Sequence, residues 1–166
     1  MTQPNDSGAT IRRAGIADAA ALAQLRWIWR THERGEYGLS QAEFEGALRL
    51  WWASREESHV AYIAERDGDA VGMAWLAVFD RIPQPRDVER IAGNVQSVFV
   101  LEAFRNQGIG GALVEAVIAH ARARGAGYLI VHPSQRAYPL YERLGFAATR
   151  QLLHMDLDRA PAAAAE

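Results

Sequence analysis

The chain has 166 residues, a formal net charge of −2 and 49% apolar residues, which suffices for one domain with a complete core. It contains no cysteine, so disulfides, thiol nucleophiles and thiolate metal sites are excluded. No apolar run approaches the roughly 20 residues of a membrane span, and the N-terminus lacks the features of a signal peptide. Charges of both signs are interspersed, without the basic stripe that nucleic-acid binding requires. We therefore expect a cytoplasmic protein that binds neither nucleic acid nor membrane.

The first half of the chain predicts a tail, a strand, two helices and a β-hairpin. Residues 1–9 are polar and predict a flexible tail, and residues 10–13 predict a strand. Apolar residues at helical spacing predict a helix from residue 16 to about residue 32. Ser40, with Glu43 three residues later, has the capping-box pattern of a helix start, and this helix is expected to end near residue 56 or 57. Asp67-Gly68 predicts a tight turn between strands at residues 59–66 and 70–79, and residues 80–93 predict a loop.

A strand-to-helix transition at residues 95–113 is the most informative stretch of the sequence. An apolar strand contains Val98, Phe99 and Val100. The glycine-rich loop that follows consists of Arg105, Asn106, Gln107, Gly108, Ile109, Gly110 and Gly111. The first turn of a helix has unpaired backbone N–H donors, and the helix dipole favours an anion in front of them. We therefore predict a phosphate-binding loop, with Arg105 adding a charged hydrogen bond.

Two common nucleotide-binding loops do not match this stretch. A dinucleotide-binding loop requires a third Gly or Ala where the chain has Leu113, and an acidic residue about 20 positions further on. A nucleoside triphosphate loop requires Gly-Lys followed by Ser or Thr, which the chain lacks. A glycine-rich turn without a ligand is the remaining alternative at this point.

The last part of the chain predicts a strand, a helix and one or two final strands. Residues 128–131 form a short apolar run that predicts a buried strand, parallel to the strand before the loop because a helix connects the two. A helix is expected from residue 135 to residue 144, with Gly145 as its C-cap. Residues 146–157 alternate weakly and predict one or two strands, and residues 158–166 predict a flexible tail. The folded domain is thus expected to span residues 10–157.

Two motifs together suggest a family. Arg105, Gly108 and Gly110 form the pattern R-x-x-G-x-G, and residues 137–146 read A-Y-P-L-Y-E-R-L-G-F. This combination resembles the GNAT superfamily of acyl-CoA N-acyltransferases, over about residues 10–157 and most strongly over residues 95–146. The resemblance implies a single-domain α/β fold with helices on both faces of a mixed, mostly antiparallel sheet. Its parallel central pair of strands would splay around the cofactor.

The resemblance also implies acetyl-CoA as a co-substrate, no metal, and a role for each matching residue. Main-chain groups of Val98, Phe99 and Val100 would contact the pantetheine arm and the thioester, and the loop from Arg105 to Gly111 would hold the pyrophosphate. Tyr141 would be the general acid that protonates the CoA sulfur. Ser134 replaces an asparagine of many family members, and it would contact the cofactor or cap the last helix.

The general base and the acceptor site are not fixed by the sequence. The strand at residues 94–100 has no carboxylate. Candidate groups for activating the amine are Gln96 and Ser97, through a water, and Glu33, Glu36, Glu89 and His132. Trp29, Trp51 and Trp52 fit the apolar helix stripes and are expected in the core. Trp27 and Tyr37 fit less well and are candidates for a pocket that binds a cationic amine.

We expect an N-acetyltransferase that moves the acetyl group from acetyl-CoA to a primary amine by direct attack in a ternary complex. Direct attack is favoured because the chain offers neither a cysteine nor a serine in a nucleophile-elbow context for an acyl-enzyme. The alternatives are an acyltransferase for another acyl group and a non-catalytic module that senses acyl-CoA. A homodimer is compatible with the resemblance, and the acceptor amine is not identified.

Overall fold

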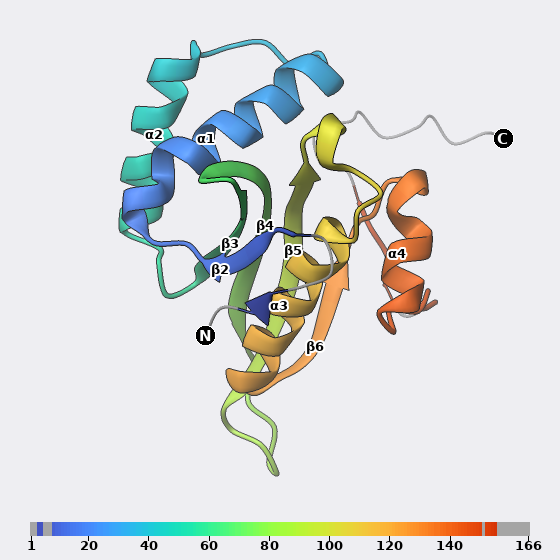
Figure 1. Cartoon of the computed structure of the whole chain (residues 1–166). Helices are drawn as coiled ribbons and strands as arrows, with labels where there is room; N and C mark the ends of the chain where they lie inside the picture. Colours follow the sequence, from blue (N-terminus) through green and yellow to red (C-terminus); the bar gives the residue numbers. More distant parts are fainter. Residues whose placement is uncertain (1–2, 5–7, 151, 156–166) are drawn as a thin grey trace, which may run out of the picture. The chain divides into compact units, whose positions relative to one another are not determined.

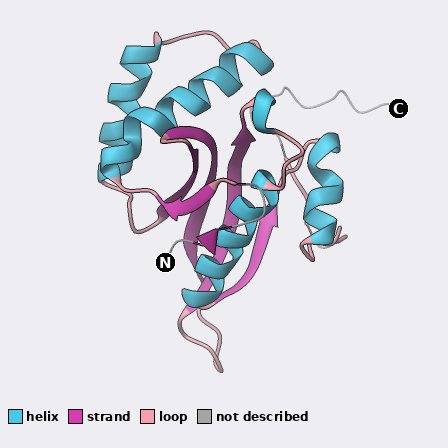
Figure 2. Cartoon of the chain, viewed as in Figure 1, coloured by secondary structure: helices cyan, strands magenta, loops and turns pink. Residues whose placement is uncertain are grey.

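The computed structural model describes residues 3–4, 8–150 and 152–155, in two compact units, Met1–Pro133 and Ser134–Glu166. The first unit contains a six-stranded sheet with its strands in chain order (Figures 1 and 2). The strands are β1 (Gln3–Pro4), β2 (Thr10–Arg13), β3 (His59–Arg66), β4 (Asp69–Arg81), β5 (Arg90–Val100) and β6 (Ala126–Val131). Neighbours from β1 to β5 are antiparallel, and β5 and β6 are parallel. The predicted mixed, mostly antiparallel sheet is confirmed.

Helices cover both faces of this sheet (Figure 1). A 3₁₀ turn at Ile16–Asp18 leads into α1 (Ala19–Ile28), and α2 (Gln41–Ala53) follows. Both pack on a buried cluster that includes Met73 and Trp75 of β4. Gly72 precedes Met73 in β4. A Cβ added to Gly72 would lie 3.2 Å from the side chain of Leu113 in α3 (Ile109–Ala123), so α3 packs closely on this position. Because successive strand residues point to opposite faces, α3 covers the face opposite to α1 and α2.

The two helices on the first face begin as the sequence predicts. α1 continues as a π-helix at Trp29–Glu33, so the chain stays helical to the expected limit. The backbone N–H of Glu43 donates to Ser40 Oγ at 3.3 Å, and the N–H of Ser40 donates to Glu43 Oε2 at 2.9 Å, which confirms the capping box. The predicted end of α2 was wrong. The helix ends at Ala53, because residues 54–58 form turns that lead directly into β3.

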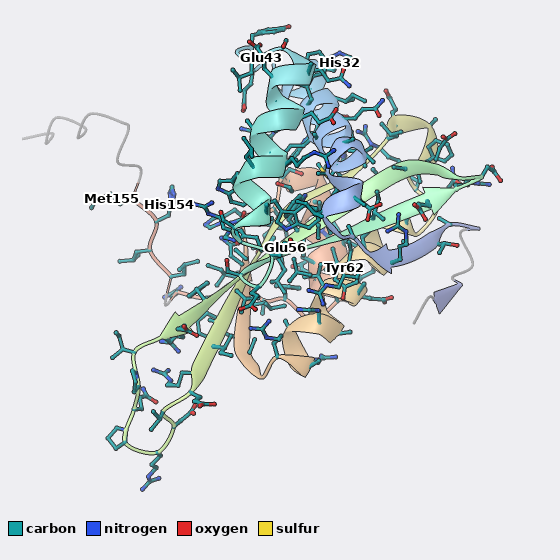
Figure 3. The ribbon with its side chains drawn as sticks, turned by 90° about the vertical axis from the view of Figure 1, so that its left-hand side faces the viewer. His32, Glu43, Glu56, Tyr62, His154 and Met155 are labelled. Carbon is teal, nitrogen blue, oxygen red and sulfur yellow. The ribbon has the colours of Figure 1, made fainter. Side chains whose placement is uncertain are left out.

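The two hairpins of the sheet differ in how well the sequence predicted them. β3 and β4 are joined at Asp67 and Gly68, which have φ values of 53° and 89° and form the expected tight turn. The loop predicted over residues 80–93 is shorter than expected, because the β4–β5 ladder continues to the pair Arg81 and Arg90. Figure 3 shows this hairpin projecting away from the end of the α1–α2 pair that carries His32 and Glu43.

The prediction of a fully buried strand at residues 128–131 was wrong. Tyr128 is 43% exposed, and residues 129–131 are half-buried. The reason is that β6 has a sheet neighbour on one side only in the described part of the chain. None of the helices in that part has the length and apolarity to span a bilayer.

The second unit contains a 3₁₀ turn at Gln135–Ala137 and α4 (Tyr138–Arg143). Gly145 follows with a φ of 90°, as the predicted C-cap requires. The strands predicted over residues 146–157 were wrong for the described residues 146–150 and 152–155, which form no strand. Leu153 is 93% exposed and Met155 is 78% exposed. The weak alternation of apolar and polar residues there therefore does not correspond to a buried strand face. Residues 151 and 156–166, including the predicted tail, lie outside the described residues.

Candidate functional site

A β-bulge interrupts β5 at Ser97. Phe99 pairs with Met73 and Gln96 pairs with Trp75, so β5 has one more residue than β4 between these two pairs. Ser97 has a φ of 51°, in the left-handed region that non-glycine residues rarely adopt. Such a bulge bends a strand and redirects its side chains. The backbone of β5 is therefore distorted at the point where the predicted thioester site begins.

The parallel pairing of β5 with β6 stops short of this bulge. The last paired residues are Val95 and Val131, so residues 96–100 continue without a β6 partner. The resemblance implies that the strands part beside Val98, Phe99 and Val100, and the pairing ends before these residues. The carbonyl of Val100 accepts a hydrogen bond of 2.9 Å from Arg105 Nε.

The glycine-rich loop enters α3 through two residues in the left-handed region of backbone conformation. Asn106 and Gly108 have φ values of 61° and 81°, and Gly108 is the N-cap of α3. The N–H of Ala112 donates to the carbonyl of Gly108 at 3.1 Å, as the first helical hydrogen bond. The N–H groups of Ile109 and Gly110 precede it and need partners from outside the helix. Successive N–H groups in such a left-handed turn form a concave site for anions.

Two arginines lie at this loop, and one of them was not foreseen. Arg105 donates to the Val100 carbonyl, forms an ion pair with Glu33 and lies over the Phe99 ring, so its guanidinium is held against β5 and the π-helix. Arg66, at the end of β3, donates from Nη1 to Gln107 Oε1 at 2.6 Å. Sequence reasoning missed Arg66 because only the order of strands brings the end of β3 to the start of α3.

A cavity of about 390 Å³ lies on the face of the sheet that carries α1 and α2. We call it the α1–α2 cavity. Its lining residues are Arg26, Leu39, Phe44, Ala47, Leu48, Trp51, His59, Trp75, Gln96 and Ser97. The bulge residue Ser97 and its neighbour Gln96 thus form part of the wall, next to the segment of β5 that has no β6 partner. Trp51, expected in the core, is 39% exposed because it faces this cavity.

The residues proposed from sequence for an acceptor pocket lie elsewhere. Tyr37 is 87% exposed. Trp27 packs edge to face on His32 and donates from Nε1 to the Leu39 carbonyl at 3.4 Å. Neither lines the α1–α2 cavity. The aromatic residues that line the cavity are instead Phe44 and Trp51 of α2 and Trp75 of β4. A helical stripe of apolar residues in the sequence does not show whether an aromatic side chain packs in the core or lines a cavity.

Of the sequence candidates for activating the amine, Gln96 and Ser97 line the cavity, whereas the three carboxylates and His132 are not among its lining residues. Glu33 pairs with Arg105, Glu36 pairs with Arg30, and Glu89 belongs to the β4–β5 loop. His132 is an exposed residue just after β6. The lining instead contains His59, whose pKa is lowered by burial and by Arg55.

The second unit holds the two remaining predicted site residues. Ser134 is exposed and occupies the N-cap position before Gln135, where its backbone carbonyl accepts from the Ala137 N–H at 2.9 Å. Tyr141 is 6% exposed and packs edge to face on Phe146, with ring centroids 5.4 Å apart. Burial raises the pKa of Tyr141 to about 12, so its hydroxyl is protonated at neutral pH.

The mixed sheet, the bulged strand and the glycine-rich helix start define an α/β protein of the acyltransferase class. Residues 21–146 match the model of the acetyltransferase (GNAT) family, which is more than half of the chain. The chain therefore belongs to the GNAT family, and it is an acyltransferase.

Three known proteins show the range of similarity. An uncharacterized N-acetyltransferase of Bacillus subtilis is 30% identical over 154 residues, which cover 89% of this chain and 96% of that protein. A glucosamine 6-phosphate N-acetyltransferase of Trypanosoma brucei brucei is 32% identical over 92 residues, which cover 54% of this chain and 59% of that enzyme. The crystal structure of a predicted acetyltransferase with acetyl-CoA, from Clostridium acetobutylicum, superposes with a TM-score of 0.75 at 18% identity, over 93% of this chain and 99% of that one. The last likeness establishes the fold.

Proposed function

We propose that this protein transfers an acetyl group from acetyl-CoA to a primary amine held in the α1–α2 cavity. The observation that carries the proposal is the position of the β5 bulge. Ser97 lines the cavity, and the adjoining segment of β5 has no β6 partner. An extended pantetheine arm fits beside such a free strand edge, because main-chain groups that lack a ladder partner can bond to its amides. The thioester would then meet the amine at the bulge.

The glycine-rich loop would hold the pyrophosphate of acetyl-CoA mainly through backbone N–H groups. Ile109, Gly110 and Gly111 lie in the first turn of α3, where free donors and the helix dipole favour an anion. Arg105 would contribute indirectly, since its bonds to Val100 and Glu33 fix the β5 end of the loop. Arg66 would add positive charge near Gln107. Ser134 would mark the start of the last helical segment by its position alone, because its side chain makes no capping hydrogen bond.

His59 would accept the proton that the attacking amine releases, directly or through a water. An alkylammonium has a pKa near 10.4 in water, so the amine must lose a proton before it attacks. The Ser58 hydroxyl donates to the Arg55 carbonyl at 3.3 Å and lies 3.0 Å from His59 Nδ1. We assign the Nδ1–H tautomer from this arrangement, because the hydroxyl then accepts from Nδ1. Nε2 carries the free lone pair of a base.

Tyr141 would return a proton to the thiolate of CoA as that group leaves. Its hydroxyl is protonated at neutral pH, which is the form that an acid catalyst requires, although burial, by raising its pKa to about 12, also makes it a weaker acid. A thiol acyl-enzyme is excluded because the chain has no cysteine, and its serines lack a nucleophile-elbow context. The reaction would therefore be a direct attack of the amine nitrogen on the thioester carbonyl, followed by loss of the thiolate.

The proposal is tested by measuring free CoA thiol with a thiol-reactive dye across a panel of amines. The protein itself gives no background because it has no cysteine. We expect amine-dependent thiol release with acetyl-CoA, and the same panel with longer acyl-CoA donors measures the acyl preference. Stoichiometric acetyl-CoA binding without thiol release from any amine would refute acetyl transfer to an amine.

A further inference from the structure

The α1–α2 cavity has apolar walls and an uneven distribution of charge. Five of its ten lining residues are large and apolar or aromatic: Leu39, Phe44, Leu48, Trp51 and Trp75. Of the lining residues, Arg26 alone carries a permanent charge, and none is an acid. Large apolar and aromatic surfaces favour a ligand with an apolar or aromatic body. A polycationic ligand is disfavoured, because it would meet an arginine and no carboxylate.

Arg26 is a half-buried cation without an anionic partner among the residues that the structure describes. Its one side-chain hydrogen bond in that part of the chain goes from Nη1 to the neutral Ser97 Oγ. Burial and the nearby Arg30 both lower the pKa of Arg26, while Glu36 raises it. In the described residues Glu36 forms its ion pair with Arg30 and none with Arg26, and Arg30 Nε donates to Glu36 Oε2 at 2.7 Å.

Other arginines in the first unit show what Arg26 lacks. Arg12 binds two carboxylates, Arg105 binds Glu33, and Arg49 binds Glu45. A buried charge without a partner is costly, and a guanidinium offers five donors in a fixed fork that suits a carboxylate or a phosphate. A ligand anion in the cavity would supply the missing partner, beside the bulge at Ser97.

We propose that the acceptor is an amine that also carries an anionic group, a carboxylate or a phosphate, and that Arg26 binds this anion. The acceptor's apolar or aromatic body packs on Phe44, Trp51 and Trp75. This assignment rests on the proposed function, since it takes the α1–α2 cavity as the acceptor site.

The test uses three aromatic probes of similar size that need no acetyl-CoA. Phenylacetate carries a carboxylate, phenyl phosphate carries a phosphate, and phenylacetamide is neutral. Calorimetric titration is expected to show that at least one anion binds about tenfold or more tightly than the amide. Arg26→Gln removes that preference, and Arg26→Lys retains part of it. The control Arg122→Gln, in the last turn of α3 and outside the cavity lining, keeps it.

Each outcome decides the assignment. A preference for phenylacetate alone that disappears in Arg26→Gln assigns a carboxylate, and a preference for phenyl phosphate that disappears in Arg26→Gln assigns a phosphate. A phosphate preference that survives in Arg26→Gln places the anion elsewhere and refutes the assignment. Equal binding of all three probes, or no binding of any, refutes it as well. Because the probes contain no amine, these results are independent of whether acetyl-CoA binds or is turned over.

Discussion

The β5 bulge predicts an unusual order of stability for two variants of one residue. Ser97→Ala and Ser97→Gly both remove the hydroxyl that accepts from Arg26, so they lose the same contact. They differ in the cost of a φ of 51°. Alanine in the left-handed region costs about 1–2 kcal/mol, whereas glycine adopts it freely but loses roughly 0.5–1 kcal/mol more backbone entropy on folding. Glycine should therefore be the more stable variant by about 0.5–1 kcal/mol.

Urea unfolding, followed by tryptophan fluorescence, measures this difference in the free energy of unfolding, and thermal unfolding measures it as a difference in Tm. In a domain of this size a change of 1 kcal/mol corresponds to about 2–4 °C in Tm, so Ser97→Gly should melt about 2 °C above Ser97→Ala. The control is Ala77→Gly in β4, where the backbone has no positive φ. There the usual order applies, and glycine is the less stable residue by about 0.5–1 kcal/mol. If Ser97→Ala equals or exceeds Ser97→Gly in stability, the bulge is not strained and the reasoning fails.

Three further predictions address catalysis and packing. Tyr141→Phe should lower kcat by about 100-fold in a steady-state assay, and an unchanged kcat excludes the acid role. As the pH falls, kcat/KM should decrease at a pH below 6.5, because burial lowers the pKa of His59 from that value and protonation removes the base. If the same acidic decrease persists in His59→Gln, another group titrates. Gly93→Ala should cost about 1–3 kcal/mol in urea unfolding, because its Cβ would lie 2.7 Å from Leu129 Cδ2. Gly46→Ala, inside α2 and with nothing within 4 Å of the added Cβ, should stabilise by about 0.5–1 kcal/mol, and equal stability of the two alanine variants refutes the packing argument.

Local signals account for the elements that the sequence predicted correctly. The capping box of Ser40 and Glu43 and the turn at Asp67 and Gly68 each depend on residues within four positions of one another, so their chemistry is visible in the chain. The glycine-rich start of α3 is local in the same way. The end of α2 had no such signal, because its last turn is stopped by the connection to β3 and not by a cap residue of distinctive type.

Features that depend on which strands become neighbours were beyond the sequence. Arg26 and Ser97 are 71 positions apart and meet only because α1 packs over the bulge in β5. The exposure of Tyr128 likewise follows from the edge position of β6. His59 gave no sequence signal as a base, since a histidine at the start of a strand has many structural uses, and its tautomer depends on the turn before β3.

The central claim is that the first turn of α3 binds the pyrophosphate of acetyl-CoA, and a charge series at Gly110 tests it most directly. Gly110→Asp and Gly110→Asn add side chains of the same size, and an acid in the first turn of a helix favours the helix itself. Calorimetric titration should show stoichiometric binding of acetyl-CoA, and not of NAD, to the unmodified protein. We expect Gly110→Asp to bind at least about tenfold more weakly than Gly110→Asn, while Gly46→Asp on α2 has no effect. Equal affinity in the two Gly110 variants, or no binding by the unmodified protein, would contradict the account.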